Sequence, residues 1–248
     1  MKLFKSMIIA FSIYSKIPVP QFAWEEEDME YMMCFFPWIG GAIGLVFYGW
    51  LALCEKVQIG ALCRACVAAA IPLIISGGFH VDGYMDTMDA FHSYQSREKK
   101  LEILKDSHIG AFAAIMLMLY YLIDLAALSE VVTGKAAFAV AAVFFLARCL
   151  SGIGVVTLKS AKKEGLLYTF ASGAQKKRVR LALYVQFTGC IALMVAVSGI
   201  YGIVAAVTGV LCFFYFKWKS YRELGGITGD TAGWDVTGCE VAVALHIC

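Results

Sequence analysis

Three aspartates, Asp82, Asp86 and Asp89, follow one another at intervals of four and three residues within the segment GGFHVDGYMDTMDAF, residues 77–91. On a helix with 3.6 residues per turn, this spacing places all three carboxylates on one face, within about 60°. Like charges at such spacing repel, and a divalent cation such as Mg²⁺ removes the conflict because it prefers oxygen ligands. The pattern therefore predicts a helix whose acidic face binds Mg²⁺ and, with it, phosphate groups.

His80 precedes this acidic face by two residues and is a candidate general base or phosphate contact, although a lone histidine is as often structural. If the helix continues, its acidic face next presents Ser93 and Arg97, and the guanidinium of Arg97 suits a phosphate. The alternative interpretation of the whole segment is a solvated acidic helix surface at the membrane.

Two further segments carry polar groups beside apolar stretches. In LKDSHIG, Lys105 and His108 can hold phosphate, and Asp106 can bind metal or position Lys105. A collar of charged side chains at the entrance of a membrane helix explains these three residues equally well. In GGITGDTAG, four glycines around Asp230 predict a tight loop whose backbone N–H groups can hold an anion. An ordinary glycine-rich turn is the alternative.

Isolated charges inside apolar stretches are a separate set of candidates. Glu240 lies in the last apolar stretch, and an ionisable residue at such a place is a functional candidate by default. Asp124 and Arg148 qualify less strongly, because they can pair with each other within a helix bundle.

Hydrophobic residues make up 60% of the 248 positions and charged residues 16%, against about 25% charged in soluble domains. The excess apolar surface must face lipid. Windows of near-spanning length fall at residues 31–53, 60–78, 109–129, 135–157, 181–200 and 201–218, with a shorter one at 236–248. We therefore expect one all-α domain over residues 1–248, a polytopic membrane bundle of about six to seven transmembrane helices.

The first 30 residues differ from a signal peptide. Their apolar run, from Met7 to Tyr14, is followed by Lys16 and two prolines rather than by a small-residue cleavage site. The run is also too short for the hydrocarbon core, about 30 Å thick. It predicts an interfacial or re-entrant helix.

Basic residues divide unequally between the two sides of the predicted bundle. Seventeen lie on the side of the N-terminus and three on the other, with Arg148 inside a span. The positive-inside rule makes the richer side cytoplasmic, and the polar segments at residues 77–108, 159–180 and 220–235 share it. The basic segment 159–180 serves as a topology signal, contacts anionic lipid or binds a nucleotide phosphate.

The motifs GGFHVDGYMDTMDAF, LKDSHIGAFA and GGITGDTAG, in this order, resemble those of the adenosylcobinamide-GDP ribazoletransferase (cobalamin synthase) family. FFPWIGGAIG at residues 35–44 and KIPVP at residues 16–20 are also similar to that family, so the resemblance covers nearly the whole chain. It implies an enzyme of the cell membrane that needs Mg²⁺. The enzyme joins adenosylcobinamide-GDP to α-ribazole or its 5′-phosphate and releases GMP.

The resemblance carries the family's functional positions onto this sequence by motif. The acidic motif falls on His80, Asp82, Asp86 and Asp89, the second on Lys105, Asp106 and Ser107, and the third on Thr228, Gly229 and Asp230; Glu240 lies where relatives carry an acid. His80, Asp82, Lys105 and Asp106 are thereby expected to be catalytic. The residues expected to bind substrate are Arg97, Ser107, Thr228 and Gly229. Those expected to bind metal are Asp82, Asp86, Asp89, Asp230 and Glu240.

Two other functions are weighed against this one. A CDP-alcohol phosphotransferase also uses membrane-helix aspartates, but that family's Ala-Arg after Asp-Gly-x-x is replaced here by Asp86-Thr87. An ion-coupled transporter using Asp124 and Glu240 would place its polar groups near mid-membrane. We expect small-molecule substrates and membrane lipid as partners and no nucleic acid; a homo-oligomer is left open.

Overall fold

The computed structural model describes residues 2–131, 134–162 and 175–248, and these residues form helices joined by short connections. The prediction of an all-α membrane bundle is confirmed. The helices run in the order α1 (Lys2–Tyr14), η1 (Glu26–Met29), η2 (Met32–Cys34), α2 (Phe36–Val57), α3 (Ala61–Ser76), α4 (Phe79–His92), α5 (Arg97–Ile103), α6 (Ala111–Glu130), α7 (Gly134–Thr157), α9 (Lys176–Ser198), α10 (Ile200–Leu224) and α11 (Gly229–Ile247).

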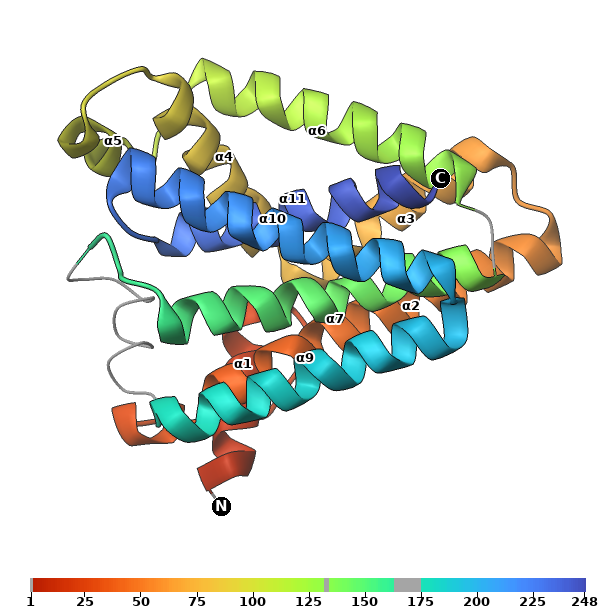
Figure 1. Cartoon of the computed structure of the whole chain (residues 1–248), viewed down its shortest axis with the longest axis horizontal. Helices are drawn as coiled ribbons and strands as arrows, with labels where there is room; N and C mark the ends of the chain where they lie inside the picture. The colour runs from red at the N-terminus through yellow and green to blue at the C-terminus, as the bar shows by residue number, and fades with distance from the viewer. Residues whose placement is uncertain (1, 132–133, 163–174) are drawn as a thin grey trace.

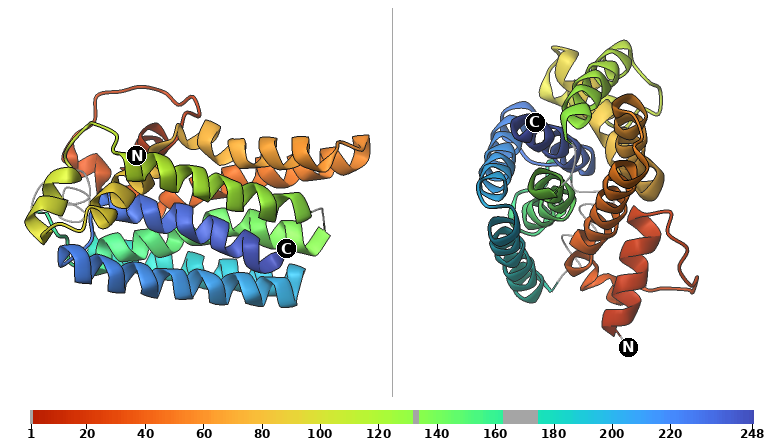
Figure 2. Two further views of the ribbon diagram at one scale, coloured as in Figure 1. Left: turned by 90° about the horizontal axis from the view of Figure 1, so that it is seen from above. Right: turned by 90° about the vertical axis from the view of Figure 1, so that its right-hand side faces the viewer.

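Helix α7 is the centre of the bundle and is buried along nearly its whole length. It packs against α2, α9, α10 and α11, and the end-on view shows it enclosed by other helices (Figure 2). Its sequence is apolar on all sides, as expected for a helix with no lipid or water face. Helices α2, α6, α9 and α10 instead expose large apolar side chains outward, such as Leu45, Met118, Leu193 and Leu211.

Small residues set the spacing between the two most closely packed helices. A side chain added at Gly40 or Gly44 of α2 would collide with the backbone carbonyls of Phe144 and Ala141 of α7. Close backbone approach of this kind is how membrane helices gain packing energy without a hydrophobic driving force. The glycines at the start of α2 therefore fix α2 against the central helix.

Within the described residues, five single helices are long and apolar enough to cross a membrane: α2, α6, α7, α9 and α10. The apolar window expected at residues 60–78 contains the shorter helix α3, Ala61–Ser76. Helix α3 ends at Ser76, and α4 leaves it at an angle of 97°, so the two together are apolar enough to form either a broken span, which would be the sixth, or a re-entrant loop. Gly77 and Gly78 form the bend, and both have positive φ. Residues other than glycine rarely adopt this conformation.

The N-terminal helix α1 packs against η1, η2 and the start of α2. Lys5 pairs with Asp28 at 3.0 Å, and the Ser6 hydroxyl donates to the Asp28 carbonyl. The segment after α1 is fixed to the bend between α3 and α4, since the Lys16 N–H donates to the carbonyl of Ile75 at 2.7 Å. This contact places the residues around Lys16 beside the start of α4.

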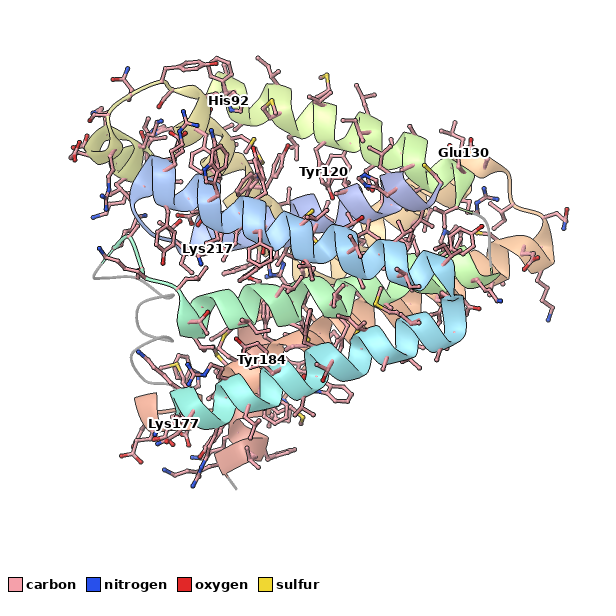
Figure 3. All side chains as sticks on the ribbon, in the orientation of Figure 1. His92, Tyr120, Glu130, Lys177, Tyr184 and Lys217 are labelled. Atoms are coloured by element: carbon pink, nitrogen blue, oxygen red, sulfur yellow. The ribbon has the colours of Figure 1, made fainter. Side chains whose placement is uncertain are left out.

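Charged side chains collect at one end of the bundle. Helix α5, the end of α10 and the starts of α9 and α11 lie at this end, opposite the C-terminus (Figure 1). Lys177 and Lys217 lie toward the same end as His92, whereas Glu130 lies at the other end (Figure 3). The described residues of α5, of the end of α10 and of the starts of α9 and α11 therefore lie at one end of the bundle, while residues 163–174 of the expected basic segment lie outside the described residues.

Candidate active site

Residues 79–92 form the helix that the aspartate spacing predicts, and its acidic face points away from the apolar side made by Tyr84, Met88 and Phe91. Asp82 is exposed, and Asp86 and Asp89 are half-buried. The Asp86 carboxylate interacts electrostatically with Asp82, Asp89, Asp230 and Lys162. Carboxylates from two helices therefore share one region.

The acidic helix ends earlier than expected. Ser93 is its C-cap, Tyr94 has a φ of 54°, and the chain turns before α5 begins. Arg97 therefore lies at the first position of α5 instead of on the acidic face. Its guanidinium packs over Gly225, at the end of α10, so that a side chain at Gly225 would collide with it. The expected continuation of the face through Arg97 is wrong because a left-handed residue cannot continue a right-handed helix.

Asp230 reaches the acidic face through a crossing of α4 and α11 in which both helices contribute glycine. A Cβ added at Gly83 would lie 2.9 Å from the Asp230 carbonyl oxygen and 3.0 Å from its Cα. A Cβ at Gly233 would lie 3.0 Å from the His80 carbonyl oxygen. Larger residues at these two positions would hold the helices apart. The two acidic motifs meet because their glycines let the backbones touch.

The expected loop at residues 225–233 is largely a helix start. Gly225 and Gly226 turn the chain after α10, and α11 begins at Gly229. Thr228 caps this helix: its hydroxyl accepts from the Thr231 N–H at 3.1 Å, and its own N–H donates to the Thr231 hydroxyl at 2.9 Å. This reciprocal cap satisfies N–H groups that a helix start leaves unpaired. The Thr228 side chain therefore stabilises the first turn of α11. The glycines of this segment had predicted a loop instead of this helix start.

Lys162 lies at the site, a position that the sequence did not single out within its basic segment. Its Nζ is 3.7 Å from an Asp230 carboxylate oxygen and donates to the Leu104 carbonyl at 3.2 Å. Two backbone hydrogen bonds pair the chain at Lys159 and Ala161 with Ile227. Since this pairing joins residues more than 60 positions apart, the sequence carries no local signal for it.

Asp89 stabilises the start of the next helix. One carboxylate oxygen accepts from the Gly110 N–H at 2.6 Å and the other from the Ala113 N–H at 2.9 Å. Gly110 has no side chain with which to cap α6, so Asp89 supplies the acceptors from α4. An anion at a helix N-terminus also interacts favourably with the helix dipole.

Glu240 lies in the bundle, away from the acidic face. It is ten residues beyond Asp230 on α11, a rise of about 15 Å at 1.5 Å per residue. One carboxylate oxygen is 2.7 Å from the guanidinium of Arg148, which is itself 1% exposed and also donates to the Phe144 carbonyl. The structure does not bring Glu240 to the expected metal site. Arg148 pairs with Glu240 rather than with Asp124.

The second motif, at residues 105–108, is an exposed connection between α5 and α6. Both the N–H of His108 and its ring Nδ1 interact with one carboxylate oxygen of Asp106, at 3.0 and 2.6 Å. This contact raises the pKa of His108 and lowers the pKa of Asp106. Lys105 and Ser107 are exposed beside them, at the same end of the bundle as the acidic face.

Two cavities open beside the first turn of α4. The polar cavity, with about 860 Å³ of space partly open to solvent, is lined by Lys16, Ser76 and Asp82 among others. The aromatic cavity, which is lined by Tyr14, Phe36 and His80 among others, has only about 40 Å³ of space that water can enter. Phe79 contributes to both. His80 and Asp82 therefore face different cavities although they are two residues apart.

The chemistry of the acidic face suits a divalent cation completed by other ligands. In the described part of the chain, no three His, Cys, Asp or Glu side chains are grouped tightly enough to hold a metal without help. Mg²⁺ is usually bound by one or two carboxylates together with water and substrate phosphates. The negative charges of Asp82, Asp86 and Asp230, near one lysine, fit that mode of binding.

Comparison with known proteins decides the family. A model of the family described as cobalamin-5-phosphate synthase matches residues 6–248. The chain belongs to this family. An adenosylcobinamide-GDP ribazoletransferase of Lachnoclostridium phytofermentans is 43% identical, over all of this chain and 94% of its own length. One of Clostridium perfringens is 30% identical over 94% of both chains. The family suggested by the motifs is thus confirmed, while no solved structure matches the chain.

Proposed function

We propose that this chain joins adenosylcobinamide-GDP to α-ribazole or its 5′-phosphate, releasing GMP and completing the nucleotide loop of cobalamin. The observation that carries the proposal is the meeting of Asp82, Asp86 and Asp230 beside Lys162, in a chain whose relatives carry the ribazoletransferase name. The two acidic motifs lie about 145 residues apart in the sequence. Their meeting in space supports a shared phosphate chemistry.

In this reaction a ribose hydroxyl of α-ribazole attacks the phosphorus attached to cobinamide. The bond from that phosphorus to the bridging oxygen breaks, and GMP leaves with the electron pair. Asp82, Asp86 and Asp230 would hold Mg²⁺, which when bound offsets the charge of the pyrophosphate oxygens. Asp89 is left to cap α6, because both of its oxygens already accept hydrogen bonds from that helix.

Basic side chains around the acidic face suit the remaining phosphate oxygens. Lys16 lines the polar cavity together with Asp82, and Lys162 approaches Asp230 from the other side. Arg97 and Lys105 lie at the same end of the bundle, where they can contact the departing GMP. Fixed cations aimed at developing charge lower the barrier of such transfers because they need no reorganisation during the reaction.

The proton of the attacking hydroxyl goes to a carboxylate of the acidic face in this proposal. Asp82 is the most exposed of the three α4 aspartates and lines the polar cavity, whereas His80 lines the aromatic one. A general base has to reach the proton directly or through one water. This placement favours Asp82 over His80 as the base. We further propose that the charged end of the bundle faces the cytoplasm.

The test is GMP release from adenosylcobinamide-GDP, α-ribazole and Mg²⁺ by the purified protein. We expect Asp86→Asn to lower the rate at least 100-fold, a loss typical for a group that stabilises transition-state charge. Glu102→Gln is the matched control, since Glu102 is an exposed acid on α5 paired only with Lys99 among the described contacts. Full activity in Asp86→Asn would remove the assignment, and ion flux into proteoliposomes without any GMP would favour a transporter.

A further inference from the structure

The polar cavity lies on the side of α4 that faces α1 and the end of α3, beside the acidic face. Water can enter about 440 Å³ of this cavity, against about 40 Å³ of the aromatic one. Small-molecule sites enclose about 300–1,000 Å³, so the polar cavity has room for a ligand the size of a nucleoside. Asp82, the carboxylate proposed to take the proton of the attacking hydroxyl, lines its wall.

The polar side chains of this wall divide into those already bonded and those still available. They belong to Ser12, Ser15, Lys16, Ser76 and Asp82. The Ser15 and Ser76 hydroxyls donate to the backbone carbonyls four residues earlier, at 2.6 and 2.7 Å. Within the described residues, the Lys16 ammonium and the Ser12 hydroxyl have no hydrogen bond or ion pair. The cavity therefore offers a cation and a hydroxyl donor for a ligand, in addition to the carboxylate of Asp82.

Lys16 is held beside the bend between α3 and α4 by both its backbone and its side chain. Its N–H donates to the Ile75 carbonyl at 2.7 Å. Its methylene groups lie across Gly77, where an added side chain would collide with them. The ammonium group therefore lies near Gly78, the N-cap of α4. The positive end of the α4 dipole is at the same place, so this end of the cavity favours an anion.

We propose that the polar cavity binds the ribose and the 5′-phosphate of α-ribazole 5′-phosphate, with the Lys16 ammonium donating to the phosphate oxygens. The inference rests on the proposed function for the identity of the substrate, and it decides between the two forms of that substrate. A phosphate monoester carries nearly two negative charges at neutral pH, and hydrogen bonds between charged groups are about twice as strong as neutral ones. Lys16 is thereby a residue that determines substrate specificity.

The interval between the two charged groups of the cavity suits a ribose. Asp82 is four residues beyond Gly78, a rise of about 6 Å along α4. A ribose carries its 5′-phosphate on the carbon outside the ring and its ring hydroxyls on the opposite edge, so one sugar bridges this interval. With its phosphate at Lys16, the sugar directs a ring hydroxyl toward Asp82, which takes the proton. The cation also offsets the repulsion between the phosphate and the carboxylate.

The direction of approach agrees with the geometry of phosphoryl transfer, in which the attacking and leaving oxygens lie roughly in line on either side of the phosphorus. Lys16 lies at the start of α4, whereas Arg97 and Lys105 lie beyond its end. The acidic face is between them. A nucleotide held by Lys16 therefore reaches the phosphorus from the side opposite to the departing GMP.

The experiment compares α-ribazole 5′-phosphate with α-ribazole, which differ only in the phosphate. Dissociation constants come from calorimetric titration of the purified protein in detergent, with and without Mg²⁺, and require no turnover. We expect the wild-type chain to bind the phosphorylated form about 10- to 100-fold more tightly, the effect of a hydrogen bond to a charged group. This preference should fall about tenfold in Lys16→Met, survive in Lys16→Arg and be independent of Mg²⁺.

The matched control is Lys2→Met, because Lys2 is an exposed lysine of α1 that pairs with Glu27 and does not line the cavity. This variant should keep the wild-type preference. Lys16→Met keeps the backbone N–H that bonds to Ile75 and an apolar stem across Gly77, so it should unfold at the temperature of wild type.

Four binding results would overturn the inference. A preference that survives in Lys16→Met, or one that exists only with Mg²⁺, would place the phosphate elsewhere. Equal weakening of both ligands in Lys16→Met would make Lys16 a structural residue or a contact to lipid phosphate. A wild-type chain that binds both forms equally while releasing GMP would refute the site and leave the reaction standing. Conversely, a preference that depends on Lys16 in a chain that releases no GMP would refute the reaction and leave the site standing.

Discussion

Gly83 allows the two acidic motifs to meet, so its replacement by alanine tests the arrangement of the site directly. The added Cβ would lie 2.9 Å from the Asp230 carbonyl oxygen and 3.0 Å from its Cα. Carbon atoms in favourable contact are about 3.5–4.0 Å apart, so the helices must separate locally by about 0.5 Å. Because the contacted atoms belong to the backbone, no side-chain rotation can relieve the overlap.

The separation should affect catalysis more than folding. Overpacking typically costs about 1–3 kcal/mol, and the higher helix propensity of alanine returns up to about 1 kcal/mol. The net loss of stability should thus be about 0–2 kcal/mol. A misplacement of about 1 Å can cost 100-fold in rate, so we expect a 10- to 100-fold lower kcat for GMP release with Asp230 displaced from Asp86.

The matched control is Gly238→Ala, at a helical glycine of α11 where an added Cβ meets no atom within 4 Å. This variant should keep full activity and should be as stable as wild type or slightly more so. GMP release gives kcat for both variants, and thermal unfolding in detergent gives their stability. If Gly83→Ala were as active as Gly238→Ala, close contact between α4 and α11 would have no part in the reaction.

Four further predictions follow from individual contacts. Asp89→Ala should lower the free energy of unfolding by about 1–2 kcal/mol, since it removes the cap of α6; thermal unfolding measures this, and an unchanged midpoint would contradict it. Glu240→Gln should destabilise the chain by about 3–5 kcal/mol because Arg148 stays buried without its anion, while the Mg²⁺ dependence of the residual GMP release stays that of wild type. Lys162→Met should raise KM for adenosylcobinamide-GDP about tenfold with a smaller effect on KM for α-ribazole; equal effects on both would argue against a phosphate contact. The Asp106 carboxylate raises the pKa of His108. Their ion pair is therefore fully present below the ordinary histidine pKa near 6.5 and is lost as pH rises through the raised pKa of His108 in the folded chain. NMR titration should find a lower His108 pKa in Asp106→Asn.

The local features of this protein follow from its sequence because they depend on neighbours a few residues apart. The apolar windows predict the helices α2, α6, α7, α9 and α10, since crossing a bilayer demands a fixed length of apolar helix. The spacing of Asp82, Asp86 and Asp89 predicts a helical face, because 3.6 residues per turn is a property of the backbone. The motifs identify the family for the same reason, as they are short and keep their order.

Tertiary structure decided which of those groups work together. Asp89 faces the N-terminus of α6 and becomes a cap, while Asp86, three residues earlier, faces Asp230. Glu240 lies on the same helix as Asp230 but pairs with Arg148, because the rise of the helix carries it into the bundle. Spacing along one chain segment cannot predict such partners, which come from other helices.

Backbone contacts between segments far apart in the sequence determine which other residues lie together. Gly83 and Gly233 are recognisable in the sequence as glycines, but their pairing depends on α4 and α11 crossing at those positions. Lys162 reaches Asp230 because its segment pairs with Ile227. Among the residues that the structure describes, His80 has no hydrogen-bond partner, because three rings from different elements enclose it. The sequence thus determined a membrane phosphotransferase with an acidic helix, and packing determined which aspartates and lysines lie together at one site.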